Sequence, residues 1–187
     1  RSSNLITQYT IGAGGALVDM GSPTVTTGAS PISITIDSTG KYAYVANNGD
    51  DTVSQYDIGK VTPGALTPMT TATVGGVGAQ LSLPASIAID SSGTHAYVAN
   101  GSGVYLYSII NGALMDDMNP NTILTGGTTP RSITIDSSGK FVYVANQGDD
   151  TISQFTIGAG GALSNPTVIS GTSNSQPYSI TNAVSIQ

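Results

Sequence analysis

The sequence lacks cysteine, tryptophan and glutamate, and charged residues make up only 9% of its 187 positions. The absence of cysteine excludes disulfides, thiolate nucleophiles and cysteine-based metal sites. Glutamate, lysine and arginine usually fill the outer faces of helices, so their scarcity argues against a helical bundle. Only five residues are basic and the net charge is −6, so we expect no nucleic-acid partner, because binding one requires lysine and arginine to neutralise phosphates.

No stretch approaches the roughly 20 consecutive apolar residues of a membrane-spanning helix, so we expect no membrane span. The sequence is instead rich in glycine, with 24 residues, and in serine and threonine. These residue types suit turns and strands. Hydrophobic residues, at 39%, are sufficient for a packed core at this chain length. The composition therefore predicts a folded chain rich in β-strands.

Two markers recur along the chain. Three segments align without gaps, each two residues after a proline, and a fourth copy begins at Pro177. They are residues 33–47, 86–100 and 132–146, after Pro31, Pro84 and Pro130. The second marker is Gly-Ala-Leu, which starts at Gly15, Gly64, Gly112 and Gly161, at spacings of 49, 48 and 49 residues. Self-similarity at a fixed period is typical of repeat architectures.

Each repeat predicts four strands. Residues 32–36 alternate between apolar and polar side chains, as in a half-buried strand. Residues 37–40 read as a tight turn, and further strands are expected at 42–46, at 52–58 and from about residue 65. A four-stranded antiparallel unit of nearly 50 residues is typical of a β-propeller blade.

The predicted fold is all-β: a β-propeller of four-stranded antiparallel blades, about four per chain, in one domain over residues 1–187. Complete blades are expected at 29–82, 83–128 and 129–175. Residues 1–28 and 176–187 would supply the two parts of a shared closing blade, which would hide both edge strands. A four-bladed monomer ring, an eight-bladed dimer and an open head-to-tail filament all satisfy these edges. A fourth interpretation is that the chain is part of a longer propeller.

The repeat also carries a family resemblance. Residues 44–47, 97–100 and 143–146 read Tyr-Val-Ala-Asn and resemble the Tyr-Val-Thr-Asn repeat of bacterial and archaeal surface propellers. Residues 130–163 are similar to the lactonase-type propellers related to 6-phosphogluconolactonase. The resemblance implies a propeller fold and, as an activity, lactone hydrolysis. The sequence departs from the family in the number of blades, because those relatives typically have seven and this chain is predicted to have about four.

The position after the proline of each repeat varies most: Ile32, Ala85, Arg131 and Tyr178. The first strand of a propeller blade lies innermost, so these side chains are expected near one mouth of the central channel. A guanidinium group there can hold a carboxylate or phosphate, and a tyrosine ring offers a stacking surface. We therefore predict Arg131 and Tyr178 as ligand-binding residues. The alternative for Arg131 is an exposed strand end that pairs with an aspartate.

All 11 acidic residues are aspartates, and most of them lie in repeated turns. Two equivalent turns of the repeat contain adjacent pairs, which are candidates for Ca²⁺ because this ion takes six to eight oxygen ligands. These pairs are Asp50 with Asp51, and Asp149 with Asp150. Their spacing matches no calcium loop, so we interpret them as solvated turn residues and predict no metal and no cofactor.

His95 is the only histidine, so any Ser-His-Asp mechanism would have to use it. It aligns with Tyr42 and Phe141, which favours a packing role for its ring. The aspartates that head the equivalent turns are expected to accept backbone hydrogen bonds. These are Asp37, Asp90 and Asp136. We therefore predict no catalytic residue.

Low charge, polar turns and unpaired blade edges favour a non-enzymatic module that is extracellular, on the cell surface or periplasmic. Such a module would bind a small molecule or glycan, or self-associate through its blade edges as a dimer or filament. The alternative is a lactone hydrolase, which rests on the family resemblance alone. A further alternative is a carbohydrate-binding propeller in which Tyr105, Tyr107 or Tyr178 stacks on sugar rings.

Overall fold

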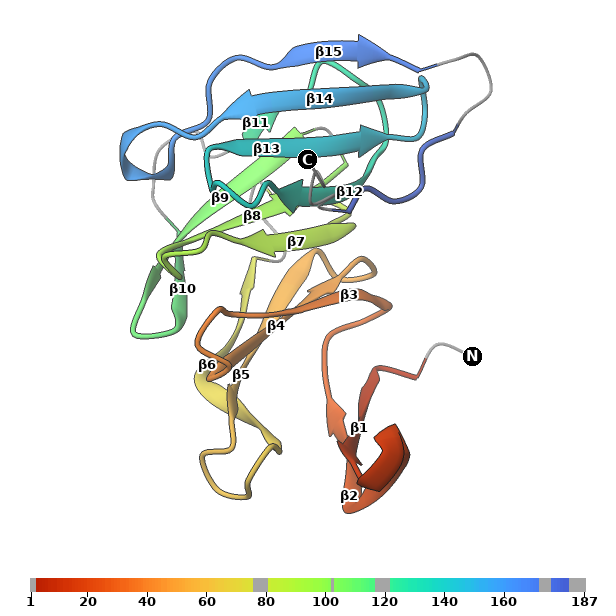
Figure 1. The fold of residues 1–187 in the computed structure, drawn as a ribbon, viewed down its shortest axis with the longest axis vertical. Coiled ribbons are helices and arrows are strands. Elements are labelled where there is room, and N and C mark those ends of the chain that lie inside the picture. The colour runs from red at the N-terminus through yellow and green to blue at the C-terminus, as the bar shows by residue number, and fades with distance from the viewer. Residues whose placement is uncertain (1–2, 76–80, 102, 117–121, 172–175, 182–187) are drawn as a thin grey trace.

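The structure is a computed structural model that describes residues 3–75, 81–101, 103–116, 122–171 and 176–181. The described chain is built from antiparallel strands and two short 3-10 turns, Ala13–Gly15 and Ala159–Gly161 (Figure 1). The strands are β1 (Leu5–Ile11), β2 (Leu17–Thr26), β3 (Pro31–Ile36), β4 (Tyr42–Asn47), β5 (Thr52–Ile58), β6 (Leu66–Gly75), β7 (Ser86–Ile89), β8 (His95–Ala99), β9 (Gly103–Ile110), β10 (Ala113–Asp116), β11 (Thr122–Leu124), β12 (Pro130–Ile135), β13 (Phe141–Asn146), β14 (Thr151–Thr156) and β15 (Thr167–Ser170). No helix in these residues is long and apolar enough to cross a membrane.

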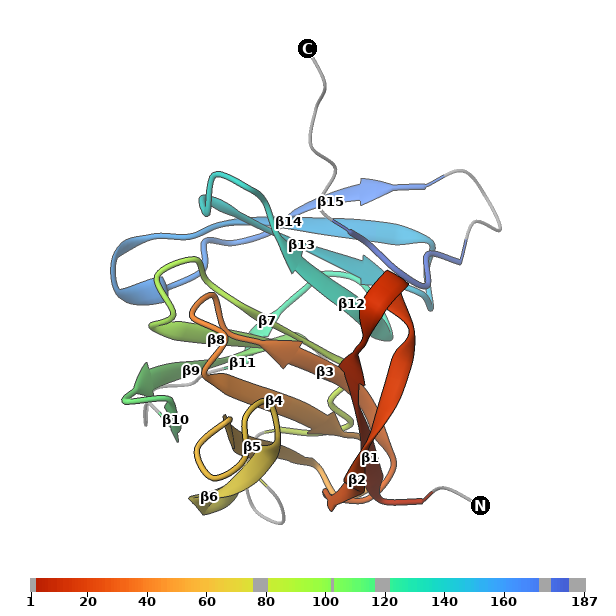
Figure 2. The same ribbon diagram turned by 60° about the horizontal axis from the view of Figure 1, so that its bottom comes forward.

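The strands form four sheets, one for each repeat. β1 pairs only with β2, whereas β3–β6 and β12–β15 are four-stranded sheets in sequence order. In the remaining sheet β7–β10 follow in order, and β11 pairs with β9 beside β10. We call these complete sheets blade 1 (β3–β6), blade 2 (β7–β11) and blade 3 (β12–β15). Their innermost strands, β3, β7 and β12, lie side by side in both views (Figures 1 and 2).

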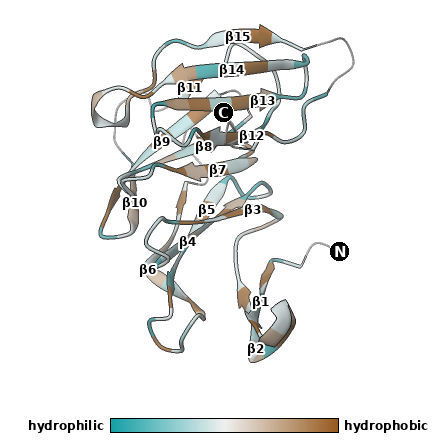
Figure 3. Ribbon diagram, in the orientation of Figure 1, coloured by the Kyte–Doolittle hydropathy of each residue, from teal (hydrophilic) through white to brown (hydrophobic). Residues whose placement is uncertain are grey.

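The predicted four strands and their order are confirmed in blades 1 and 3, whereas blade 2 departs from the prediction because β10 and β11 both pair with β9. The pairing register is also repeated, with Ile34 opposite Val45, Ile87 opposite Val98 and Ile133 opposite Val144. A slip of one residue would turn every apolar side chain to the other face of the sheet, so the alternating pattern strongly specifies this register. The most hydrophobic residues accordingly lie mainly in the strands (Figure 3).

An aspartate closes the first turn of every blade, as predicted. In blade 1 the carboxylate of Asp37 accepts hydrogen bonds from the backbone N–H groups of Thr39, Lys41 and Tyr42. The turn ends at Gly40, whose φ of +69° is left-handed and favours glycine. Asp90 and Asp136 make the corresponding bonds in the other two blades.

The hydrophobic core lies between successive blades rather than within one of them. Between blades 1 and 2, Tyr44 packs with Ile87 and Tyr107 in one buried cluster. A second cluster lies between blades 2 and 3, where Tyr97 packs with Ile133. Each blade therefore depends on its neighbours to bury its apolar faces.

The predicted shared closing blade is not formed in the described part of the chain. β1 and β2 make a separate two-stranded sheet that packs mainly against β4 and β5 of blade 1. Residues 176–181 lie at the other end of the array, where the backbone of Ile180 hydrogen-bonds to Ser132 of β12. The β1–β2 hairpin and blade 3 stand apart in Figure 1, so the described blades form an open array. The final residues of the predicted closing strand, 182–187, lie outside the described residues.

Candidate functional site

A small cavity lies where the innermost strands of blades 2 and 3 begin. Its volume is about 210 Å³, and its lining includes one charged side chain, Arg131. The other lining residues are Asn48, Leu83, Ala85, Gly101, Thr129 and Pro130. They come from the starts of β7 and β12, from the loops before them and from neighbouring turns. We call this region the Arg131 mouth.

The structure brings the two predicted ligand-binding residues together. The guanidinium carbon of Arg131 lies 5.8 Å from the centre of the Tyr178 ring, a cation–π distance. The Nε–H of Arg131 donates to Oε1 of Gln147 at 2.8 Å. Within the described residues no carboxylate lies within ion-pair distance of Arg131, so an uncompensated positive charge faces the cavity. The alternative that Arg131 pairs with an aspartate is not realised in this part of the chain.

Gln147 was missed by the sequence reasoning, although a signal was present. It follows the repeated Tyr-Val-Ala-Asn motif, at the position that Asn48 occupies in blade 1. Asn48 also lies at this mouth, where its amide donates to the carbonyl of Pro84 at 3.2 Å. Positions that vary between otherwise similar repeats therefore gather at one mouth of the array.

The rim of this mouth is built from strained backbone. The residue before each repeated proline has a left-handed φ: 51° at Ser30, 47° at Leu83, 52° at Thr129 and 33° at Gln176. Such angles are uncommon for residues other than glycine and need support from surrounding contacts. Asp51 supplies such support by accepting the N–H of Leu83 at 2.7 Å, and Asp150 accepts that of Gln176 at 2.6 Å.

The other members of the aspartate pairs also bind loop backbone. Asp50 accepts the N–H of Ala29 at 2.8 Å, and Asp149 accepts that of Thr128 at 3.0 Å. No group of three possible metal-ligating side chains occurs among the described residues. The turn role expected for these four aspartates is thus supported by direct contacts with the backbone. That they bind no metal stays a prediction.

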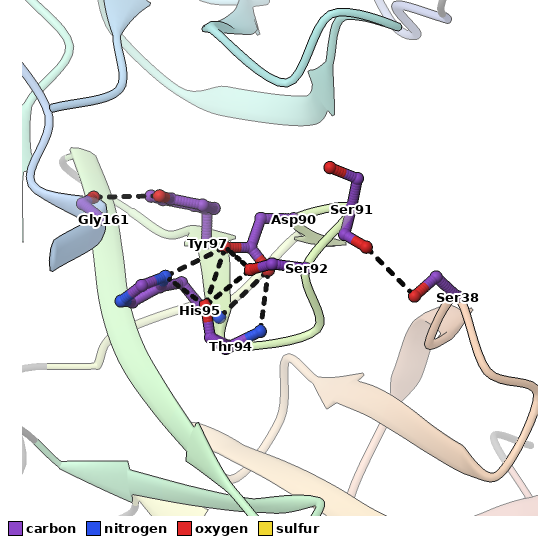
Figure 4. A network of polar contacts seen from close by, with 8 residues as sticks. All are labelled: Ser38, Asp90, Ser91, Ser92, Thr94, His95, Tyr97 and Gly161. Atoms are coloured by element: carbon purple, nitrogen blue, oxygen red, sulfur yellow. Dashed lines mark hydrogen bonds and ion pairs between the residues drawn. The ribbon is translucent and has the colours of Figure 1, made fainter. Parts of the chain in front are cut away.

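A second polar group lies at the far end of the innermost strands, around the only histidine (Figure 4). Nδ1 of His95 lies 2.9 Å from Oδ2 of Asp90, and Thr94 and Ser92 extend the network. Burial by itself raises the pKa of Asp90, but the hydrogen bonds from His95, Ser92 and Thr94 outweigh it and hold the pKa below its usual value. This carboxylate is therefore ionised and fixes the orientation of the imidazole ring.

The His95 ring packs as the aligned aromatic rings predict. A Cβ on Gly161 of blade 3 would lie 2.5 Å from the His95 ring, and one on Gly112 would lie 2.2 Å from the Tyr42 ring. His95 thus occupies in blade 2 the place of Tyr42 in blade 1, against the glycine of the next Gly-Ala-Leu motif. Ser92 bonds to Asp90 rather than to the imidazole, so no serine completes a Ser-His-Asp relay with His95 among the described residues.

Two of the tyrosines proposed to stack on sugars are in the core. Tyr105 and Tyr107 are 3% and 1% exposed and pack against each other with ring centres 4.8 Å apart. That part of the carbohydrate-binding hypothesis was wrong, because strand β9 turns both rings toward neighbouring strands. Tyr178 is the exposed one of the three, at 64%.

The repeated antiparallel blades, packed side by side along their innermost strands, define a β-propeller protein. A profile of the family described as "Lactonase, 7-bladed beta-propeller" matches residues 3–167. The chain therefore belongs to this family, as the Tyr-Val-Ala-Asn repeats indicated. No curated protein is significantly similar to the chain.

Solved structures give the same fold. A protein from Lactobacillus plantarum superimposes with a TM-score of 0.76 at 23% identity, covering 89% of this chain and 49% of the other. A putative 6-phosphogluconolactonase from Bacteroides fragilis gives 0.72 at 22% identity, with coverages of 89% and 52%. The periplasmic gluconolactonase of Pseudomonas aeruginosa gives 0.74 at 19% identity, with coverages of 89% and 48%. The chain spans about half the length of these structures.

These findings correct the predicted functional class. The expectation of a non-enzymatic extracellular or cell-surface module was wrong, and so was the expectation that the protein is not an enzyme. The family is named for lactonases, and two of the three similar structures carry lactonase names. The error arose because the repeated residues, which dominate the sequence, build blades and carry no chemistry of their own.

Proposed function

We propose that the protein is a lactone hydrolase and that the lactone binds at the Arg131 mouth. The observation that carries this proposal is the Arg131 guanidinium, which faces a cavity without a carboxylate partner in the described chain. Family membership supplies the reaction class. The names of the similar structures suggest a sugar-acid lactone of the gluconolactone type as the substrate.

In lactone hydrolysis, water adds to the ring carbonyl carbon and forms a tetrahedral intermediate with a negatively charged oxygen. The ring C–O bond then breaks, and the departing oxygen takes up a proton to become a hydroxyl group. Arg131 is suited to stabilise the oxyanion, because a preorganised cation in a cavity acts where charge develops. The hydrogen bond from its Nε–H to Gln147 fixes the plane of the guanidinium group.

The cavity lining contains neither a carboxylate nor an imidazole, so the proton acceptor has to lie elsewhere. His95 is too distant, because it lies at the opposite end of strands of four to six residues, or roughly 13–20 Å away at about 3.3 Å per residue. The geometry of the Arg131 mouth therefore supports a role in binding the lactone and stabilising the oxyanion.

The test is hydrolysis of gluconolactone and of its 6-phosphate by purified protein and three variants. Arg131→Gln removes the cation, and we expect kcat to fall by about 10²- to 10³-fold. Lys60→Gln is the matched control, since it removes a cation that pairs with Asp57 on an exposed loop. His95→Phe installs the ring that Phe141 provides in blade 3, and it should leave kcat unchanged.

Two results would contradict the proposal. If the folded protein hydrolyses neither gluconolactone nor its 6-phosphate, the assigned activity is wrong. Loss of activity in His95→Phe, with Arg131→Gln remaining active, would move the active site to the Asp90–His95 pair.

We further propose that the protein works in the periplasm. We also propose that its ligand is a small molecule and that it binds no nucleic acid. The compartment is suggested by the name of the Pseudomonas aeruginosa relative. The ligand size is suggested by the cavity, which at about 210 Å³ is small. Cell fractionation of the source organism would test the compartment, and recovery in the cytoplasmic fraction would contradict it.

A further inference from the structure

The guanidinium group of Arg131 has one edge occupied and another edge open. An arginine carries five N–H donors in a planar fork, one on Nε and four on the two Nη atoms. The Nε–H donates to Oε1 of Gln147 at 2.8 Å, and the Nη groups donate to no described residue. Gln147 therefore holds the group by Nε and leaves the edge formed by the two Nη atoms to a ligand.

The ring of Tyr178 restrains the same group without using any of these donors. Its centre lies 5.8 Å from Cζ of Arg131, and it attracts the cation through the quadrupole of the ring rather than through an oxygen or nitrogen acceptor. Gln147 and Tyr178 thus order the guanidinium group before a ligand arrives. Such ordering lowers the entropic cost of binding.

Arg131 is the only positive side chain that the described residues place at this end of the strands. Lys41 and Lys140 directly precede β4 and β13, and the opposite ends of those two strands pair with the starts of β3 and β12. Lys60 follows β5 at the same far end, and it already pairs with Asp57. The whole chain has a net charge of −6. An anion that enters the mouth therefore has one described cation to bind, the Arg131 guanidinium.

An edge with two N–H donors side by side matches the two oxygens of a carboxylate. The pair forms two parallel charge-assisted hydrogen bonds, each about twice as strong as a bond between neutral groups. A neutral ester offers the same edge a single carbonyl oxygen without charge. The open edge of Arg131 therefore favours a carboxylate over an ester.

Lactone hydrolysis creates a carboxylate from a neutral ester. In the tetrahedral intermediate, the attacked carbon carries the oxyanion and the oxygen that came from water. When the ring C–O bond breaks, the ring oxygen takes up a proton and these two oxygens become those of a carboxylic acid. The acid gives its proton to solvent near pH 7, because the pKa of such a group is about 4. An edge that faces a neutral ester before the reaction thus faces a carboxylate after it.

The other walls of the mouth suit a small hydroxylated molecule. Asn48 and Thr129 bring an amide and a hydroxyl group to the lining, and neither is charged. Nδ2 of Asn48 donates to the carbonyl of Pro84, which leaves its Oδ1 able to accept from a ligand. These groups can bond to the hydroxyls of a sugar acid, so the lining favours a sugar acid over an aliphatic acid.

We propose that the Arg131 mouth binds the carboxylate of a sugar acid through the two Nη groups, and that the product of the reaction therefore inhibits the enzyme. The choice of ligand rests on the proposed function, whereas the preference for a carboxylate rests on the open edge of Arg131. The acid binds more tightly than the lactone it comes from. Hydrolysis accordingly slows as the acid accumulates.

Calorimetric titration of the 187-residue chain with gluconate and with gluconamide tests the carboxylate site. The two ligands carry the same hydroxyl groups, but gluconamide has a neutral amide in place of the carboxylate. We expect gluconate to bind about tenfold more tightly or better, and Arg131→Gln to abolish this preference. Lys140→Gln is the matched control, because it removes one positive charge from the far end of the same blade and should keep the preference.

A second variant changes the charge at the site without removing the arginine. In Gln147→Glu a carboxylate can still accept the Nε–H of Arg131, but it neutralises the guanidinium group. Gluconate should therefore bind about tenfold more weakly than to the wild type, while the affinity for gluconamide stays the same. Unchanged gluconate affinity in this variant would contradict the proposed contact.

A gluconate preference in the wild type and Lys140→Gln, but not in folded Arg131→Gln, would support the carboxylate site. Equal binding of the two ligands, no binding of gluconate, or an unchanged preference in Arg131→Gln would overturn it. Product inhibition is supported if gluconate competes with gluconolactone with an inhibition constant below KM, and it is overturned if that constant exceeds KM.

The binding measurements do not depend on catalysis, so the two proposals fail in different ways. A folded protein that hydrolyses no lactone but keeps an Arg131-dependent preference for gluconate would contradict the proposed function and support the carboxylate site. Hydrolysis of gluconolactone without any preference for gluconate would support the function and overturn the carboxylate site.

Discussion

Blades 2 and 3, which each pack on a preceding blade, differ from blade 1 in how deeply the innermost strand is buried. The innermost strands of all three are nearly identical in sequence. Ile34, Ile87 and Ile133 occupy the same position of Ser-Ile-x-Ile-Asp segments. Ile87 and Ile133 are 5% exposed, because the preceding blade covers them, whereas Ile34 is 52% exposed. The same residue is thus part of the core or part of the surface according to the neighbour it meets. Stability in this array therefore belongs to the junctions rather than to single blades.

The largest test of this comparison replaces the repeated isoleucine. Ile87→Ala should lower the free energy of unfolding by about 2–5 kcal/mol, because it opens a cavity in a packed cluster. Ile34→Ala should cost less than about 1 kcal/mol, since half of its side chain already contacts water. Urea unfolding of dilute, monomeric protein measures both. Equal costs would show that the face of β3 is covered in solution.

A smaller difference in the free energy of unfolding is expected when alanine replaces the first glycine of two Gly-Ala-Leu motifs. Gly112 and Gly15 have the same left-handed φ, so alanine at either position should cost about 1–2 kcal/mol of backbone strain. Gly112→Ala should cost about 1–3 kcal/mol more, because its methyl group would displace the packed Tyr42 ring. Comparing the melting temperatures of the two variants measures the extra loss of stability caused by the contact with Tyr42. If both variants melt together, the ring adjusts freely and the junction is looser than the contacts indicate.

Removing one hydroxyl group makes the comparison finer. Tyr44→Phe leaves the carbonyl of Gly112 without its donor and should cost about 1 kcal/mol. Tyr143→Phe removes a hydroxyl that has no partner among the described residues and should be close to neutral in the monomer. The midpoints of urea unfolding provide the measurement. A clear loss in Tyr143→Phe would reveal a partner at the open face of blade 3.

The sequence was sufficient to predict the blades because each local signal agreed with the others. Alternating strands, aspartate turns and glycines at left-handed positions recur with the same spacing, and repetition made each of them visible. The junction partners were not predictable in the same way. Tyr44 and Gly112 are 68 residues apart, and only the stacking of blades brings them together. Their two motifs were each visible in the sequence, but their contact was not.

In the candidate site, too, local sequence signals were predictable and contacts between segments were not. The variable position after each proline correctly brought Arg131 and Tyr178 to one mouth, because strand order fixes where innermost strands begin. Gln147 was missed, since it lies in a turn of the neighbouring strand and only the register of β12 on β13 places it beside Arg131. Closure of the propeller was predicted from matching sequence ends. It is not formed in the described part of the chain, where β1 and β2 pair only with each other.

The smallest expected effect is the change in stability with pH that arises from Asp90, at the contact between blades 2 and 3. Asp90 lies beside His95, which packs on blade 3, and hydrogen bonds hold the pKa of its carboxyl below the usual value of 3.8. The folded protein therefore binds fewer protons than the unfolded chain near pH 4, so this stabilisation is full above that pH and is lost as the pH falls through the folded pKa. Asp90→Asn should lower the unfolding free energy at pH 6, and the difference from wild type should shrink below pH 4. Asp136→Asn is the matched variant, because Phe141 replaces the histidine in blade 3 and removes the imidazole bond from the carboxylate. A larger loss in Asp136→Asn than in Asp90→Asn at pH 6 would show that the His95 bond does not contribute to this junction.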